Sequence, residues 1–320
     1  MLINSRNKFF SYTKYILLAI IVCTLLRCIF YTYIDLFEEI SPFHDTNSYS
    51  GDVLSINDKY TIRINTFRRN EELKKIVRHY TACPHIEELQ IIWSDLKFKP
   101  PPLSFFQLQP NHIPVRFEIH NFDSLSNRFL ALSDIKTETI YSTDDDVIVS
   151  CDDMTIGFSV WLNSKVPMVG FSRRSHYLDS RGQYVYAYKE HVHLRGEYSM
   201  VLTKNAFFSR EIMAMYNDAS LAPLRKFIDH NRNCEDVLLS FIAANATGRP
   251  AIYVQAKVTD LGEVGGISSG ASHKNVRNTC VTTFVNHFGR DPLVFSPYEV
   301  RRVRKYNPSY LGLDKGLLVD

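Results

Sequence analysis

Apolar and polar residues alternate after residue 57 in a pattern that indicates strands separated by helices. Residues 60–67 (YTIRINTF) alternate like a half-buried strand, and residues 69–80 place apolar side chains at helical spacing. Three further strands are expected at 86–93, 115–120 and 138–143. Asp152 and Asp153 are expected at the N-cap of a helix that reaches Trp161, and a fifth strand is expected at 168–171. This order predicts an α/β fold with a mostly parallel central sheet and covering helices.

The second half of the chain has longer helical patterns and fewer strands. Strands are expected at 183–188, 198–203 and 252–258, and helices are expected at 205–216, 219–230, 235–246 and 273–288. Glycine and serine fill residues 262–270, which we interpret as a mobile loop over a site. No internal repeat or linker interrupts residues 58–320, so a single α/β domain is predicted there.

The N-terminal segment has the pattern of a membrane anchor. Residues 15–34 form an apolar run that only Arg27 interrupts, and a spanning helix needs about 20 such residues. Arg6, Lys8 and Lys14 precede the run without an acid, so the positive-inside rule places residues 1–14 in the cytosol. We therefore expect a transmembrane signal anchor at 15–34, a stem at 35–57 and a lumenal domain at 58–320. A cleaved signal peptide and a buried helix remain alternatives.

Composition narrows the classes of function. The net charge is only +3, which argues against a nucleic-acid-binding protein. In a lumenal domain Cys83, Cys151, Cys234 and Cys280 would lie where disulfides form, and the sequence alone leaves the pairing of Cys83 and Cys151 open. Asn245 begins a glycosylation sequon, which is weak support for the same compartment.

Three adjacent carboxylates are the sharpest chemical feature of the chain. Asp144, Asp145 and Asp146 directly follow the strand expected at 138–143. Neighbouring carboxylates repel one another unless a cation or hydrogen-bond donors compensate their charge. In open α/β sheets, ligands bind at the carboxyl ends of the strands. Oxygen ligands suit Mn²⁺ or Mg²⁺, which can hold a diphosphate. The alternative is a solvated acidic turn. A strand carrying His191 and His193 offers another pair of metal ligands, but no third ligand matches it.

Several segments in order resemble the exostosin-like glycosyltransferases of family 64. These segments are TDDDVIVSCDDMTIGFSVW, EYSMVLTKNAFFS, NCEDVLLSFIAANATGRPAIYV and SHKNVRNTC followed by FVNHFGRDPLV. The resemblance runs from about residue 60 to residue 293. Residues 41–70 are most similar to the plant branch, which mannosylates glycosylinositol phosphoceramides.

The resemblance implies roles for particular residues. Asp146 would ligate the metal, and Asp144 and Asp145 would contact the donor ribose and sugar. Arg69 and Arg128 would hold the diphosphate side of the nucleotide, since guanidinium groups match phosphate geometry.

Two more residues are assigned to the reacting end of the donor. Asp236 would lie below the sugar ring, and Arg277 would lie near the leaving diphosphate. A disulfide between Cys234 and Cys280 would tie their segments together.

The resemblance also implies the fold, the topology and the ligands. It implies a GT-A type fold with a single mixed central sheet, a single-pass type II topology in the Golgi membrane, and retention of the anomeric configuration. The partners would be a nucleotide-sugar donor and a glycolipid or glycan acceptor, with mannose from GDP-mannose and a glycosylinositol phosphoceramide as first choice. The alternatives are a UDP-N-acetylhexosamine transferase, a non-catalytic lumenal scaffold, and a metal-dependent phosphohydrolase or nucleotidyltransferase.

Each assigned residue outside the triplet also has a plain structural alternative. Asp236 could cap the helix that follows it. Arg277 could face solvent on the last helix, and Arg69 could only begin a polar helix face. Arg128 could pair at the surface with Asp123 or Asp134, which would contribute about 0–1 kcal/mol.

Overall fold

The computed structural model describes residues 20–26, 29, 54–55, 57–262 and 271–302, and it divides the chain into two compact units, Met1–Ser50 and Gly51–Asp320. In the first unit, residues 20–26 and 29 are helical. Among the described residues, no helix combines the length and apolar character needed to cross a membrane. The tail expected at 1–14, most of the anchor at 15–34 and most of the stem at 35–57 lie outside the described residues.

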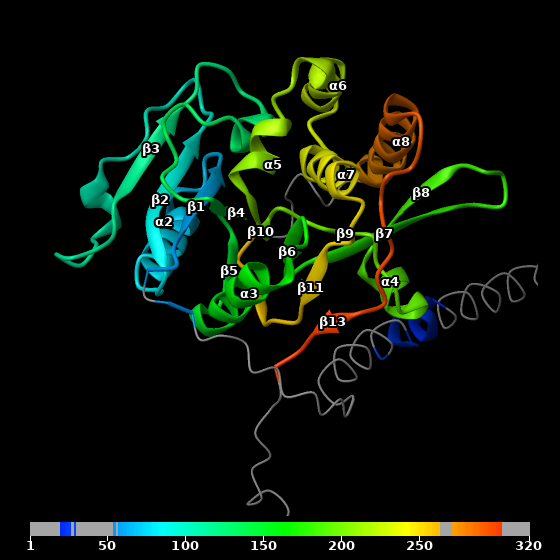
Figure 1. The fold of residues 1–320 in the computed structure, drawn as a ribbon, viewed down its shortest axis with the longest axis horizontal. Coiled ribbons are helices and arrows are strands. Elements are labelled where there is room, and N and C mark those ends of the chain that lie inside the picture. The colour runs from blue at the N-terminus through cyan, green and yellow to red at the C-terminus, as the bar shows by residue number, and fades with distance from the viewer. Residues whose placement is uncertain (1–19, 27–28, 30–53, 56, 263–270, 303–320) are drawn as a thin grey trace, which may run out of the picture. The chain divides into compact units, whose positions relative to one another are not determined.

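A mixed sheet of eight strands lies at the centre of the second unit (Figure 1). Its strands, in spatial order, are β13 (Glu299–Val300), β11 (Ile252–Val254), β6 (Met168–Gly170), β10 (Asn205–Ser209), β4 (Thr139–Asp144), β1 (Tyr60–Thr66), β2 (Ile86–Trp93) and β3 (Val115–Ile119). β4, β1, β2 and β3 are parallel, whereas β10 is antiparallel to both β4 and β6. The predicted α/β class is confirmed, with a large mixed central sheet flanked by helices.

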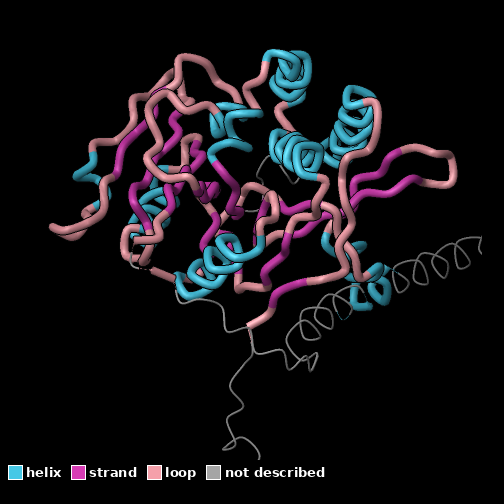
Figure 2. The backbone as a smooth tube through the Cα atoms, viewed as in Figure 1, coloured by secondary structure: helices cyan, strands magenta, loops and turns pink. Residues whose placement is uncertain are grey.

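Helices cover both faces of this sheet (Figure 2). They are α2 (Asn70–Tyr80), η1 (Leu103–Phe106), η2 (Leu125–Phe129), α3 (Cys151–Ser164), α4 (Lys189–Arg195), α5 (Arg210–Met215), η3 (Ala219–Leu221), α6 (Ala222–Asn231), α7 (Glu235–Thr247) and α8 (Ala271–Phe288). Ile62 and Ile64 of β1 share one apolar cluster with α2 and α3, and a second cluster contains apolar residues of α5, α6, α7 and α8. Phe207 and Phe208 of β10 belong to different clusters, as side-chain alternation along a strand requires.

Two small sheets complete the fold. β5 (Val147–Val149) pairs antiparallel with β12 (Val258–Asp260) directly after the aspartate triplet. β7 (Arg173–Leu178) pairs with β8 (Tyr184–Ala187) and β9 (Met200–Val201), and the β7–β8 hairpin projects from the unit in Figure 1. The first of these pairings brings residues near 260 to the end of β4.

Three local predictions were wrong. Residues 205–209 form β10 rather than the start of a helix, because they pair with both β4 and β6 in the sheet. His191 and His193 lie on α4 and not on a strand, so they do not form the expected pair on a strand face. Asp152 and Asp153 lie in the first turn of α3 rather than at its N-cap, because α3 begins at Cys151 and the Ser150 hydroxyl caps it by accepting from the Asp153 amide.

Two disulfides link distant segments of the second unit. Cys234 is bonded to Cys280, as the family resemblance implied, and this bond joins the start of α7 to the middle of α8. Cys83 is bonded to Cys151, a pairing that the sequence left open, and it joins the end of α2 to the start of α3. Helices α7 and α8 lie side by side in Figure 1.

Candidate active site

The aspartate triplet lies at the carboxyl edge of the parallel strands. Asp144 is the last residue of β4 and stands in register with Asn65 near the end of β1. Asp145 and Asp146 form the turn that leads into β5. The triplet therefore occupies the sheet edge at which ligands bind in folds of this kind, as the sequence predicted.

Asp145 points into the protein. Its carboxylate accepts from the Thr66 hydroxyl at 2.8 Å, from the Phe67 amide at 3.3 Å and from Arg69 Nη1 at 3.2 Å. Burial raises the pKa of Asp145 to about 7, and these donors only partly offset it. Asp145 is therefore a carboxyl group that exchanges its proton near neutral pH.

Asp146 is more open and lies among groups from three segments. Its carboxylate is ion-paired with Arg69, which precedes α2. A Cβ at Gly262 would lie 2.9 Å from Asp146 Oδ2 and 3.0 Å from Asp260 Oδ1, so glycine allows the β12 segment to approach the triplet closely. Burial and the neighbouring charge of Asp144 raise the pKa of Asp146. Carboxylate oxygens gathered in this way suit a hard divalent cation.

Arg128 connects the triplet to a second pair of acids. The residue is 3% exposed, and its guanidinium group lies 2.6 Å from Asp144 Oδ1 and 3.1 Å from Glu235 Oε1. It also donates to the carbonyl of Thr203 at 3.2 Å. Although burial opposes the charged form, Asp144 and Glu235 hold the pKa of Arg128 above its ordinary value. The surface pairing with Asp123 or Asp134 is therefore wrong, and Asp123 instead pairs with Arg232.

The second acid pair is at the start of α7 and is almost completely buried. Glu235 faces Arg128, and Asp236 faces Arg277 of α8. Burial, with the charge of Asp236, raises the pKa of Glu235 to about 7. Burial acts in the same direction on Asp236, but Arg277 and Arg128 hold the pKa of Asp236 below its ordinary value. Neighbouring carboxyls whose pKa values separate in this way are typical of reactive sites.

Arg277 is held between an acid and an aromatic ring. Its Nη2 lies 3.1 Å from Asp236 Oδ2, and its Nη1 donates to the Tyr186 hydroxyl at 2.8 Å. The guanidinium carbon also lies 4.9 Å from the centre of the Tyr186 ring, within the range of a cation–π contact. Arg277 is therefore part of the site and is not a solvated residue on the face of α8.

The backbone at Cys234 explains how the start of α7 is fixed. Cys234 precedes α7 with a φ of +80°, a left-handed conformation that costs free energy for any residue with a side chain. The disulfide to Cys280 holds this turn from α8, three residues after Arg277. Asp236 does not cap α7 from the preceding position, and its Oδ1 accepts from the Val237 amide at 2.8 Å.

All seven residues assigned from the sequence converge on one region, and three further residues join them. Contacts link Arg69 to Asp145 and Asp146, Arg128 to Asp144, and Asp236 to Arg277. The sequence analysis missed Glu235, Tyr186 and Asp260. Glu235 could have been found as the acid next to Asp236, whereas no local signal marked Tyr186 or Asp260.

Comparison with known proteins identifies the family. The model of the glycosyl transferase family 64 domain matches residues 60–304, which include every residue of the site named above. The chain belongs to glycosyl transferase family 64. It is 39% identical over 251 residues to glycosylinositol phosphorylceramide mannosyl transferase 1 of Arabidopsis thaliana. The aligned region covers 74% of each chain.

Two other relatives carry different names. Exostosin-like 2 of Homo sapiens is 29% identical over 252 residues, covering 75% of this chain and 76% of the relative. Glucosamine inositolphosphorylceramide transferase 1 of Arabidopsis thaliana is 32% identical over 225 residues, covering 68% of this chain and 28% of the relative. The relatives support a transferase that takes a nucleotide-sugar donor and a glycolipid or glycan acceptor.

A second cluster of residues that could ligate a metal does not form a metal site. Ligand atoms of His79, Cys83 and Cys151 lie within 4.8 Å of one another. The disulfide occupies both sulfurs, and His79 Nε2 lies 2.8 Å from the Val149 carbonyl. The oxygen atoms of the triplet are therefore the better match for the divalent cation that the family resemblance implies.

Proposed function

We propose that this chain is a retaining glycosyltransferase of the GT-A type that transfers mannose from GDP-mannose to a glycosylinositol phosphoceramide. The mannosyl transferase relative, 39% identical over three quarters of both chains, supports the choice of sugar and acceptor. The main structural support for a transfer reaction is the position of Arg128, whose guanidinium group joins the aspartate triplet to the Glu235–Asp236 pair. This contact makes the two acid groups parts of one site.

The residues divide the work of sugar transfer between two ends of the site. Sugar transfer develops positive charge at the anomeric carbon and negative charge on the departing diphosphate. Asp236, buried beside Arg277, would stabilise the positive charge. Arg277 and Arg128 would stabilise the negative charge, because buried guanidinium groups form strong hydrogen bonds to phosphate oxygens. Arg69 would hold the diphosphate, and Asp144 and Asp145 would hold the donor ribose and sugar.

A divalent cation, Mn²⁺ or Mg²⁺, is part of this proposal. Asp146 would hold it. Its side chain is more exposed than that of Asp145 and does not share the buried hydrogen bonds of Asp145, whereas Asp144 is already bound to Arg128. When bound, the cation would neutralise charge on the diphosphate. Arg69 contacts Asp146 from a half-exposed position, so its guanidinium group can move aside for the cation.

We further propose that the catalytic domain is lumenal and is anchored in the Golgi membrane through residues 15–34. Two disulfides in the second unit support an oxidising compartment, since disulfides are rare in the cytosol. The apolar run and its preceding basic residues support a type II orientation.

The test measures transfer by the full chain in detergent. GDP-mannose and UDP-N-acetylglucosamine are each supplied with a glycosylinositol phosphoceramide, with and without Mn²⁺, and the products are identified by mass. Mannose transfer is expected. Transfer of an amino sugar would instead support the second candidate, which the glucosamine transferase relative favours. Release of phosphate without transfer, or binding of neither nucleotide, would refute the proposal.

A matched pair of variants tests the metal. Asp146→Asn should abolish turnover without loss of fold, whereas Asp152→Asn removes an acid whose side chain is 78% exposed and should leave activity unchanged. Normal activity in Asp146→Asn would remove the metal assignment.

A further inference from the structure

Arg63 is a completely buried cation in the middle of β1. Its side chain has 0% exposure, and Glu118 of β3, with 2%, lies 3.0 Å from its Nη1. Gln90 of β2, which stands in register with Arg63, also accepts from Nη1. Burying an ion costs several kcal/mol after relaxation, and burial lowers the pKa of Arg63. None of the roles assigned above explains why β1 carries such a residue.

The remaining donors of Arg63 bind the segment that carries Arg128. Nε donates to the carbonyl of Arg128 at 3.1 Å, and Nη2 donates to the carbonyl of Leu130 at 3.0 Å. These two carbonyls lie at the C-terminal end of η2. One buried side chain therefore fixes the backbone on both sides of Phe129.

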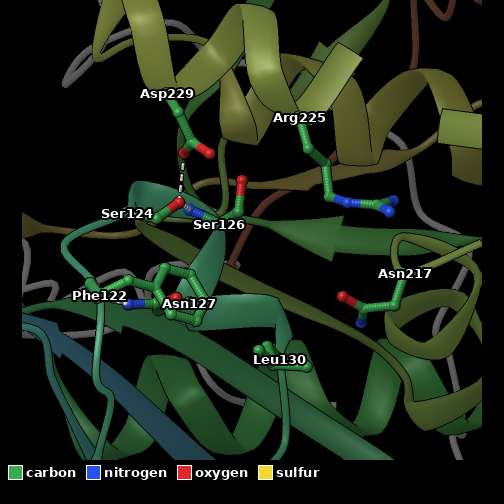
Figure 3. Close-up of a pocket in the computed structure, with 8 residues that line it drawn as sticks. All are labelled: Phe122, Ser124, Ser126, Asn127, Leu130, Asn217, Arg225 and Asp229. Atoms are coloured by element: carbon green, nitrogen blue, oxygen red, sulfur yellow. Dashed lines mark hydrogen bonds between the residues drawn. The ribbon is translucent and has the colours of Figure 1, made fainter. Parts of the chain in front are cut away.

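The side of η2 that faces α6 borders a cavity. The cavity has a volume of about 110 Å³, and Figure 3 shows polar side chains of η2 and α6 among the residues that line it. The Ser124 hydroxyl bonds to Asp229 across one side of it. On this side η2 is held by polar contacts and by the buried Phe129 ring, whereas Arg63 binds its C-terminal end from the sheet.

The position of η2 determines what Arg128 can reach. Ser142 of β4, in register with Arg63, accepts from Arg128 Nη2 at 3.3 Å. The same Arg128 guanidinium group lies 2.6 Å from Asp144 and 3.1 Å from Glu235. A shift of about 1 Å in η2 would break at least one of these contacts, and misplacements of this size can cost about 100-fold in rate.

We propose that Arg63 is a positioning residue, which holds η2 by the carbonyls of Arg128 and Leu130 so that Arg128 spans the triplet and the Glu235–Asp236 pair. This inference rests on the proposed function for its kinetic test. Arg63 touches no reacting group and acts only through Arg128.

The first test compares two arginines of the same polar network in the full chain. Arg116 of β3 bonds to Glu88 at 3.0 Å and to the carbonyl of Asp134 at 3.0 Å, but it does not contact η2. Arg63→Met should lower kcat for mannose transfer by about 10- to 100-fold, with a smaller change in KM. Arg116→Met should keep kcat within about threefold, whatever its melting temperature. Equal losses of kcat in the two variants would overturn the proposal.

The second test is a double-mutant cycle that a general structural role would not satisfy. In the Arg128→Lys background, adding Arg63→Met should cost less than about threefold, because the contact that Arg63 positions is already altered. The same loss in both backgrounds would show that Arg63 does not act through Arg128. If Arg63→Met fails to fold, Arg63→Lys replaces it. Lysine keeps the charge beside Glu118, but a single ammonium group cannot reproduce the fork that reaches both carbonyls.

Hydrogen exchange separates this inference from the proposed function. Amides of residues 125–130 should exchange faster in Arg63→Met and at the wild-type rate in Arg116→Met, without any substrate. Unchanged exchange in Arg63→Met would refute positioning even if the chain transfers mannose. Absence of transfer by the wild type, with faster exchange in Arg63→Met, would refute the function and keep the structural link.

Discussion

Replacing Arg277 with methionine would leave a buried acid without its main partner. Asp236 and Arg277 have side chains that are 8% and 11% exposed, and their charged atoms lie 3.1 Å apart. In Arg277→Met the Asp236 carboxylate remains buried next to Glu235, and Arg128 is then the cation among the described residues that lowers its pKa. Removing one partner of a buried ion pair typically costs about 3–5 kcal/mol, because the other charge is left uncompensated. For a domain of this size, that loss lowers the melting temperature by roughly 6–20 °C.

The sign of the pH dependence follows from the direction of the pKa shift. In the wild type the pKa of Asp236 lies below its ordinary value, so the ion pair stabilises the fold above the ordinary pKa and is lost as pH falls through the folded one. In Arg277→Met burial is less strongly opposed and the folded pKa of Asp236 rises. Protonation then relieves the buried charge, so the cost of the variant should be largest near pH 8 and smallest near pH 5.

The assay is unfolding of the full chain by heat and by urea under non-reducing conditions, followed by circular dichroism at both pH values. Arg232→Met is the matched control, since Arg232 pairs with Asp123 at 3.0 Å with both side chains about one-third exposed or more. That pair should contribute only about 0–1 kcal/mol. Adding Asp236→Asn to Arg277→Met should recover part of the loss, because the stranded charge disappears. Equal costs for Arg277→Met and Arg232→Met, or a cost that grows toward pH 5, would refute the reasoning.

Three other changes test separate features of the site. Because the folded pKa of Asp145 is about 7 and its ordinary value is 3.8, this carboxyl should cost the metal-free fold about 3 kcal/mol of stability between pH 5 and pH 8, and Asp145→Asn should remove that part of the fall in the urea midpoint and leave the part due to Glu235. Replacing both Cys234 and Cys280 with serine opens a link of 46 residues, so it should cost about 4 kcal/mol and also lower kcat; the same change at Cys83 and Cys151 should lower stability alone. Gly262→Ala should raise the Mn²⁺ concentration that gives half-maximal activity, with the melting temperature nearly unchanged, because its Cβ would press on Asp146; an unchanged Mn²⁺ requirement would contradict this.

Alternation of side chains was sufficient to predict the strands that carry the triplet. β1, β2 and β4 were expected at 60–67, 86–93 and 138–143 and are found within one or two residues of those bounds. In β1, for example, Ile62 and Ile64 pack in an apolar cluster, whereas Thr61 and Arg63 on the other face are buried in polar contacts, so the alternation is kept although both faces are buried. The placement of Asp144 at the end of β4 follows from the same pattern.

The failed predictions concern segments whose conformation depends on distant partners. Residues 205–209 are apolar enough for either a strand or a buried helix, and periodicity cannot separate the two in so short a run. These residues form a strand because they pair antiparallel with β4 on one side and β6 on the other. For α4 a local signal was missed, since Glu190 lies in its first turn and Gly196 ends it as a left-handed C-cap.

The charge contacts of the site were beyond sequence reasoning for a related cause. Arg128 and Glu235 are 107 residues apart, and Arg69 and Asp146 are 77 apart. The family resemblance assigned roles to Arg128 and Arg69, but it did not reveal that each is bound to an acid in the folded chain. Arg63 was counted only as one polar residue in an alternating strand, and its function as a buried support appears only when η2 is placed above β1.

The balance of charge in the site explains why these contacts belong together. Among the described residues, six carboxyl groups face three guanidinium groups and one ammonium group; the acids are Asp144, Asp145, Asp146, Glu235, Asp236 and Asp260, and the cations are Arg69, Arg128, Arg277 and Lys204. Full ionisation would leave two negative charges uncompensated in a largely buried region, which is costly. Two of the six, Asp145 and Glu235, accordingly have pKa values of about 7, so bound protons compensate part of this excess. A divalent cation would supply the same two positive charges, and its binding should therefore release protons from the site.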